Sequence, residues 1–189
     1  MRSVGWVVLL ASLACASGSG QGGSSPAELL KKAGGSETSP PAGGPEYFVV
    51  DTVRGTAQRT FNAVRFTYDS LGIAFSYYEP DRFELGGFIP ELKELDGEPP
   101  SRWIDCGEGM VASNNADRYA ISLTLGTRVL RLDSLTSRVE TVVRARSRQR
   151  DVWSSLTRCA TRGTLEARIV DGVRALLRRY GPGGRGRTP

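Results

Sequence analysis

The distribution of apolar residues divides the chain into an apolar run near the N-terminus, one long patterned segment, and a polar segment on each side of the patterned one. Between residues 47 and 180, apolar side chains recur at the period of two expected of strands or the period of three to four expected of helices. The two polar segments consist largely of Gly, Pro, Ser and charged residues, and they bury too little apolar surface to offset their conformational entropy. The pattern predicts a globular domain over 47–180, a disordered tether within 15–46 and a disordered basic tail over 181–189.

Two segments have the periodicity of amphipathic helices. In the first, apolar residues recur at alternating steps of four and three, with Thr56 as the N-cap and Gly72 as the C-terminal stop. The second carries Glu166 near its N-terminal end, where the helix dipole favours a negative charge. We expect helices over 57–71 and 164–180, and each needs a cover for its apolar face.

Alternating apolar and polar residues predict about five strands. They lie at 47–53, 73–78, 83–85, 119–129 and 139–145. Gly86 and Gly87 are expected to end the third strand, and the segment 89–102, rich in Pro and charge, is expected to be a loop. A polar reversal at 133–137 favours an antiparallel hairpin between the last two strands. The element order is β-α-β-β-β-β-α, and one antiparallel sheet with both helices on one face buries every apolar face, so the predicted class is α+β.

Residues 1–14 have the features of an export signal. Arg2 is their one charged residue, and the apolar run over 4–11 is shorter than the ~20 residues that cross a bilayer. Residues 12–15 (Ser-Leu-Ala-Cys) then resemble the lipobox of bacterial lipoproteins, whose cysteine takes a diacylglycerol before cleavage. This resemblance implies that Cys15 is lipidated and anchors the protein to a membrane. Ala16, in place of Asp, implies the periplasmic side of the outer membrane. An ordinary signal peptide, giving a soluble periplasmic or secreted protein, is the alternative.

The chain has three cysteines, and a lipid on Cys15 would leave two. Cys106 and Cys159 then form an even pair in an oxidising compartment, which favours a disulfide. Two buried free thiols or a redox dithiol are the alternatives, although the close Cys-x-x-Cys spacing of redox dithiols is absent.

This organisation resembles that of envelope lipoproteins of the BamC (NlpB) type. A lipobox, a low-complexity tether and a strand-helix-strand unit over 47–78 carry the resemblance. It implies a helix-grip fold and a role beside the outer-membrane protein assembly machinery, although this chain has one such domain where that family has two. The spacing of Cys106 and Cys159 also resembles an uncharacterised group of bacterial lipoproteins, which implies no activity.

The composition excludes several classes of catalytic site. The sequence has no histidine, so histidine-based acid-base catalysis, Ser-His and Cys-His nucleophiles and nearly all catalytic zinc sites are impossible. Acidic residues over 91–108 could include a catalytic carboxylate pair, but between prolines they are typical of a solvated loop. Asn114, Asn115 and Asp117 lack the full pattern of a calcium loop. We therefore expect no enzymatic activity, no cofactor and no metal site.

Arginines recur at every second position from the end of the last predicted strand onward. The net charge of +5 falls to about +4 when the segment with Arg2 is removed, and it is concentrated here. A row of arginines could contact lipid phosphates or an acidic protein partner. Alternatively, it forms a solvated strand face that deters edge-to-edge pairing. Export and the scarcity of interleaved aromatic residues argue against nucleic acid. The four residues are Arg144, Arg146, Arg148 and Arg150.

Two functions fit these features. The first is a non-enzymatic, membrane-anchored interaction or structural lipoprotein with an envelope protein partner, accessory to outer-membrane or envelope assembly. The second is a periplasmic module that binds a small molecule or lipid in a cavity between the sheet and the long helix.

Overall fold

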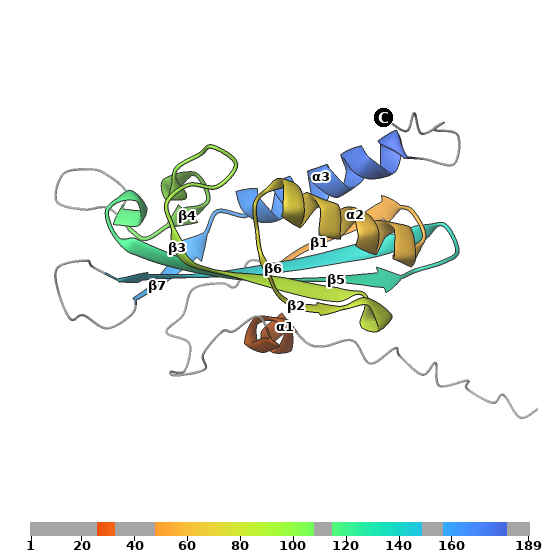
Figure 1. Ribbon diagram of the computed structural model, residues 1–189, viewed down its shortest axis with the longest axis horizontal. Coiled ribbons are helices and arrows are strands. Elements are labelled where there is room, and N and C mark those ends of the chain that lie inside the picture. Colours follow the sequence, from red (N-terminus) through yellow and green to blue (C-terminus); the bar gives the residue numbers. More distant parts are fainter. Residues whose placement is uncertain (1–25, 33–47, 108–114, 149–156, 181–189) are drawn as a thin grey trace, which may run out of the picture.

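The computed structural model describes residues 26–32, 48–107, 115–148 and 157–180. They form an α+β fold with one antiparallel seven-stranded sheet, so the predicted class is confirmed (Figure 1). The strands are β1 (Phe48–Arg54), β2 (Phe75–Glu79), β3 (Glu84–Leu92), β4 (Ile104–Asp105), β5 (Ala120–Arg131), β6 (Thr136–Arg148) and β7 (Thr157–Thr161). The helices are α1 (Pro26–Lys32), α2 (Ala57–Ser70) and α3 (Thr164–Arg179), with 3₁₀ turns at Pro80–Arg82, Pro100–Arg102 and Asn115–Asp117.

The β5–β6 hairpin is the centre of the sheet. Its two strands pair continuously from Ala120 opposite Arg148 to Arg131 opposite Ser137, and the strand order is β2-β3-β5-β6-β7-β4. The other edge of β6 is shared, because β1 pairs with its first half and β7 with its second. In the reversal, the carboxylate of Asp133 accepts a hydrogen bond from the Leu135 backbone N–H at 2.7 Å. The predicted hairpin is therefore confirmed, and it is longer than the sequence indicated.

Helices α2 and α3 lie together on one face of the sheet, as predicted (Figure 1). The Thr56 hydroxyl accepts a hydrogen bond from the Arg59 backbone N–H, and Gly72 has the positive φ expected of a C-terminal stop. The core between the layers is built from large, fully buried side chains of both helices and the central strands. They include Phe61, Tyr68, Ile121, Leu123, Leu125, Leu165 and Ile169.

Three side-chain hydroxyl groups are linked by hydrogen bonds within this core. The Tyr68 hydroxyl lies 2.9 Å from Thr127 Oγ1, which in turn lies 3.0 Å from Thr141 Oγ1. Burial raises the pKa of Tyr68 far above its usual value, so the phenol stays protonated. These hydrogen bonds satisfy hydroxyl groups that are buried away from water.

Strand β3 does not end at its glycines. The prediction that Gly86 and Gly87 end the third strand was wrong, and so was the start of the loop at residue 89, because β3 continues to Leu92. A Cβ at position 86 would lie 2.2 Å from the Tyr77 ring and 2.6 Å from the Leu125 carbonyl oxygen. These glycines allow neighbouring groups to approach the strand closely, which is a use of glycine within a sheet rather than at its end.

Strands β4 and β7 were not predicted, so the expected five strands become seven. Ile104 pairs with Thr161 and Asp105 with Ala160, which adds the two-residue β4 to the edge of β7. Both strands are too short for a period of two to stand out from the sequence around them.

The segment over 15–46, predicted to be disordered throughout, contains the helix α1. It lies on the face of the sheet opposite α2 and α3 (Figure 1). Leu29 is fully buried there and packs with Val142 of β6. The composition of the segment suggested too little apolar surface for folding, but Leu29 packs into a site formed by residues of the sheet. Within the described residues, no helix combines the length and the hydropathy needed to cross a membrane.

Candidate functional site

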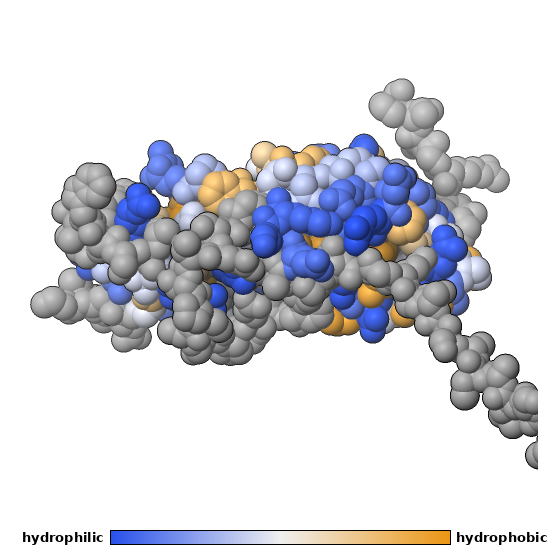
Figure 2. Space-filling model, turned by 90° about the horizontal axis from the view of Figure 1, so that it is seen from below, coloured by the Kyte–Doolittle hydropathy of each residue, from blue (hydrophilic) through white to orange (hydrophobic). Residues whose placement is uncertain are grey.

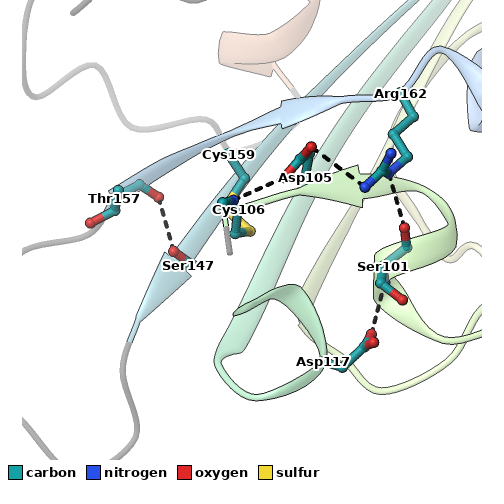
Figure 3. Close-up of a disulfide and its surroundings, with 9 residues drawn as sticks. Ser101, Asp105, Cys106, Asp117, Ser147, Thr157, Cys159 and Arg162 are labelled. Atoms are coloured by element: carbon teal, nitrogen blue, oxygen red, sulfur yellow. Dashed lines mark hydrogen bonds and ion pairs between the residues drawn. A yellow bond between two sulfur atoms is a disulfide. The ribbon is translucent and has the colours of Figure 1, made fainter. Parts of the chain in front are cut away.

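The two predicted cysteines form a disulfide. Cys106, just after β4, is bonded to Cys159 of β7, so the bond joins segments 53 residues apart, and the predicted pairing replaces the free-thiol and dithiol alternatives (Figure 3). Arg162 donates to the Ser101 carbonyl oxygen at 3.1 Å and lies 3.4 Å from the Asp105 carboxylate. These contacts tie the same corner together, and the disulfide is therefore a structural link.

Glu166 lies in the first turn of α3, as predicted, but it is buried rather than exposed to solvent. Its Oε1 accepts a hydrogen bond from Thr161 Oγ1 at 2.9 Å, and its Oε2 has no hydrogen-bond partner among the described residues. Burial raises the pKa of this carboxyl, because the charged form loses its hydration. The sequence pattern pointed to the helix dipole and gave no indication of this desolvation.

The predicted arginine row lies on the face of the sheet that carries α1. Arg144, Arg146 and Arg148 alternate along β6 with residues that face α2 and α3, and Arg150 lies outside the described residues. The interpretation as protection of an exposed edge was wrong, because β6 has strands paired on both sides. Arg146 is directly opposite Arg158 of β7, so basic residues of two strands are neighbours on this face.

Helix α1 contacts the sheet where glycines of two neighbouring strands are paired. Gly86 of β3 pairs with Gly126 of β5, and a Cβ at position 126 would lie 2.7 Å from the Cβ of Leu29. The Tyr77 ring covers Gly86 in the same way. Leu29 and Tyr77 thus occupy the space that side chains at positions 86 and 126 would take, and either glycine-to-alanine change would displace a neighbour.

An ion-pair cluster fixes the end of α1. Lys32 Nζ lies 2.8 Å from Glu84 Oε2 and 2.9 Å from Glu79 Oε2, and Glu84 is fully buried. Partial burial lowers the pKa of Lys32, but the hydrogen bonds with Glu84 and Glu79 outweigh it, so the pKa is raised. The charge of Glu84 is therefore neutralised by a residue of the predicted tether.

A second buried carboxylate lies on the same face. Glu140 of β6 is paired with Arg128 of β5, which is directly opposite it, and with Arg138 at 3.2 Å. Figure 2 views the molecule from this side, where hydrophilic residues and smaller hydrophobic patches are both visible among the described residues. The face thus combines ion-paired charged residues with the apolar site of Leu29.

Strand β2 is an outer strand of the sheet and carries exposed aromatic rings. Phe75 is 36% exposed and Tyr78 is 41% exposed. Tyr78 stacks on Phe61 with ring centroids 5.4 Å apart, and Phe75 stacks on Tyr68 at 6.1 Å. Because core rings support them from below, the two exposed rings have fixed positions at the edge. We call these two residues, with the outer edge of β2, the aromatic edge.

Several predicted candidates do not come together as a site. Asp117 accepts a hydrogen bond from the Ser101 backbone N–H at 2.8 Å, while Asn114 lies outside the described residues, as does Cys15. In the described part of the chain, no three or more side chains of His, Cys, Asp or Glu are grouped so that they could hold a metal ion.

Comparisons with known proteins found no match: no protein-family model, no characterised protein and no solved structure is detectably similar to this chain.

Proposed function

We propose that this chain is a non-enzymatic, lipid-anchored interaction protein of the bacterial cell envelope, and that a protein partner binds at the aromatic edge. The observation that carries the proposal is the pair of exposed rings, Phe75 and Tyr78, on an outer strand of the sheet. Aromatic side chains with fixed positions lose little conformational entropy on binding, and they are enriched among the residues that dominate binding energies.

The edge itself offers a second kind of contact. Backbone N–H and C=O groups on the outer side of β2 can pair with an extended segment of another protein, and side-chain pockets then give specificity. The register of β2 against β3 shifts between Phe75 and Tyr77, which limits the regular part of the edge to a few residues. The partner segment is accordingly short and extended, with apolar side chains that pack on the two rings.

Anchoring rests on the N-terminal sequence. The resemblance of residues 12–15 to a lipobox implies a diacylglycerol on Cys15, and the disulfide between Cys106 and Cys159 is typical of proteins that fold in an oxidising compartment. Several acyl chains hold a protein stably at a membrane without a spanning helix. An accessory role in outer-membrane or envelope assembly, on the periplasmic side, fits this location.

A small-molecule or lipid carrier is less well supported. The space between the sheet and the long helices is occupied by large side chains such as Phe61, Tyr68 and Ile169, each fully buried. A ligand in that space would have to displace core residues, at a cost comparable to that of overpacking a core. The exposed rings are available without any such rearrangement.

Affinity purification from membranes tests the proposed partner site. The full-length protein is crosslinked in cells, solubilised mildly and compared with a Phe75→Ser/Tyr78→Ser double variant. Leu135→Ser is the matched control, because Leu135 is 70% exposed at the tip of the β5–β6 hairpin. We expect one fixed partner with the wild type and the control, and at least tenfold less of it with the double variant. Equal recovery with all three would contradict the proposed site.

The anchor is tested separately by the intact mass of the mature protein. We expect a chain that begins at Cys15 and carries the added mass of a diacyl or triacyl group. A mature chain that begins at any other residue would contradict the anchor while leaving the partner site open to its own test.

A further inference from the structure

We propose that the face of the sheet that carries α1 is turned towards the membrane, where its basic residues rest against anionic lipid headgroups. This inference rests on the lipid anchor proposed for Cys15, and it adds the orientation of the domain and the surface that meets the bilayer. Three observations support it: the docking of α1, the length of chain before α1, and the charges that share its face.

The docking of α1 makes part of the predicted tether a fixed part of the domain. Leu29 is fully buried over Gly126, and Lys32 forms ion pairs with Glu79 and the buried Glu84. The chain that leads back towards Cys15 therefore departs from this face of the sheet, and from no other point of the folded domain.

The length of chain before α1 limits how far this face can lie from the anchor. Eleven residues lead from Cys15 to Pro26, and at ~3.6 Å per residue they reach at most about 40 Å in any conformation. Without docking, the limit would be set by the 33 residues from Cys15 to Phe48, or about 120 Å. Docking of α1 thus reduces the maximum reach about threefold.

The short connection favours one orientation of the domain. If α2 and α3 faced the bilayer, the residues before α1 would have to pass around both the sheet and the helix layer, each about 10 Å thick. With the opposite orientation, α1 and its surroundings lie next to the anchor. The second orientation leaves the connecting residues far more conformational freedom.

The charges on this face match an anionic surface. Arginines on β5, β6 and β7 share the face, whereas the carboxylates of Glu84 and Glu140 are buried and ion-paired within it. Arginines outnumber carboxylates on this face of β5, β6 and β7, because Glu140, which is ion-paired with Arg128 and Arg138, is the one acidic residue among them. The net charge of this face of the three strands is therefore positive, as required for attraction to anionic headgroups over about one Debye length, ~10 Å at 0.1 M salt. These arginines are Arg128, Arg138, Arg144, Arg146, Arg148 and Arg158.

Site-specific spin labels test the orientation. Val50, directly opposite Glu140, is 45% exposed on the face with α1, and Phe66 of α2 is 52% exposed on the other side. The lipidated full-length protein, with Val50→Cys or Phe66→Cys, is labelled with a nitroxide and placed in phosphatidylglycerol-containing vesicles that include a lipid with a chelated nickel headgroup. We expect the label at position 50 to relax several-fold faster than the label at 66. Equal rates, or a faster rate at 66, would overturn the orientation.

Two controls identify the cause of the orientation. Leu29→Asp in the labelled background should undock α1 and reduce the contrast between positions 50 and 66, whereas Leu135→Asp should leave it intact. Phosphatidylcholine vesicles or high salt should also reduce the contrast, because headgroup attraction is removed or screened. A contrast unchanged by Leu29→Asp overturns the role of α1, and a contrast unchanged by lipid charge and salt overturns that of the arginines.

The intact mass of the same samples separates this inference from the proposed anchor. Acyl mass on Cys15 with equal relaxation at both positions overturns the orientation alone. Absence of acyl mass overturns the anchor, and the orientation with it.

Discussion

The two faces of the sheet are covered by different kinds of contact. On one face, α2 and α3 bury a continuous apolar core of aromatic and branched side chains. On the other face, the seven-residue α1 buries Leu29 over Gly126, and Lys32 forms ion pairs with Glu79 and Glu84. The first face defines the fold, whereas the second presents charge and holds the segment that leads to the proposed anchor.

The magnitudes expected for the two faces differ accordingly. Burial of one leucine contributes roughly 1.5–3 kcal/mol, and an isolated helix shorter than about 12 residues does not persist in water. Helix α1 therefore owes its structure to its contacts with the sheet, and it can detach without unfolding the domain. The side chains of the core face pack against residues of several elements.

The largest effect is expected for a cavity in the core face. Phe61→Ala removes a fully buried ring that also supports Tyr78 and Phe83, and it should lower the free energy of unfolding by about 3–5 kcal/mol. Denaturant unfolding followed by circular dichroism measures the change. The matched control is Phe66→Ala on the exposed side of α2, with an expected change below about 0.5 kcal/mol. Similar losses for both variants would contradict the assignment of the core.

A loss of similar size is expected when the disulfide is removed. The Cys106→Ser/Cys159→Ser variant opens a loop of 53 residues, and the chain-entropy relation predicts a loss of about 4 kcal/mol. Thermal unfolding of the variant should match that of the wild type under reductant. If reductant left the wild-type midpoint unchanged, the disulfide would not be a main support of the fold.

A smaller and local effect is expected on the face with α1. Leu29→Ala removes the side chain that packs over Gly126, and the global free energy of unfolding should change by no more than about 1–2 kcal/mol. Hydrogen exchange of residues 26–32 should reach the rate of an unstructured peptide, while β5 and β6 stay protected. A large loss of global stability would show that α1 belongs to the main cooperative unit, so the contrast between the faces would fail.

The smallest effect concerns pH. Because burial raises the pKa of Glu166, the unfolded chain ionises first as pH rises, and stability falls between the ordinary pKa of the carboxyl and the raised one. Glu166→Gln keeps an acceptor for Thr161 and removes this fall, so it should stabilise the domain by about 1 kcal/mol at neutral pH and not below pH ~4. Unfolding free energies across that range, with the exposed Glu94→Gln as control, test this. A gain that did not depend on pH would contradict the assignment.

Sequence patterns predicted the elements in which the amphipathic pattern repeats over many residues. The helices around Phe61 and Ile169 and the β5–β6 hairpin have many repeats of an amphipathic pattern, so they stood out from the sequence alone. The pairing of Cys106 with Cys159 followed from the parity of the cysteines and the expected compartment. These features depend on local pattern or on a count, and neither requires knowledge of the packing.

The features that escaped prediction depend on contacts between distant residues. Gly86 looked like a strand end, yet it is a glycine because the Tyr77 ring lies against it. Leu29 looked too isolated to fold, and its site is supplied by Gly126 and Val142, about a hundred residues later in the chain. That β2 is an outer strand with exposed rings follows from the strand order, which no local period encodes.

The docking of α1 on the sheet is the central claim, and a disulfide trap measures it most directly. A Leu29→Cys/Val142→Cys variant of the full-length protein is oxidised mildly, and the linked peptides are quantified by mass spectrometry. Glu28→Cys/Val142→Cys is the control, because Glu28 is one residue away and exposed. We predict that the Leu29 pair is linked in most molecules and the Glu28 pair in few. Equal linkage of the two pairs, or none for the Leu29 pair, would contradict the account.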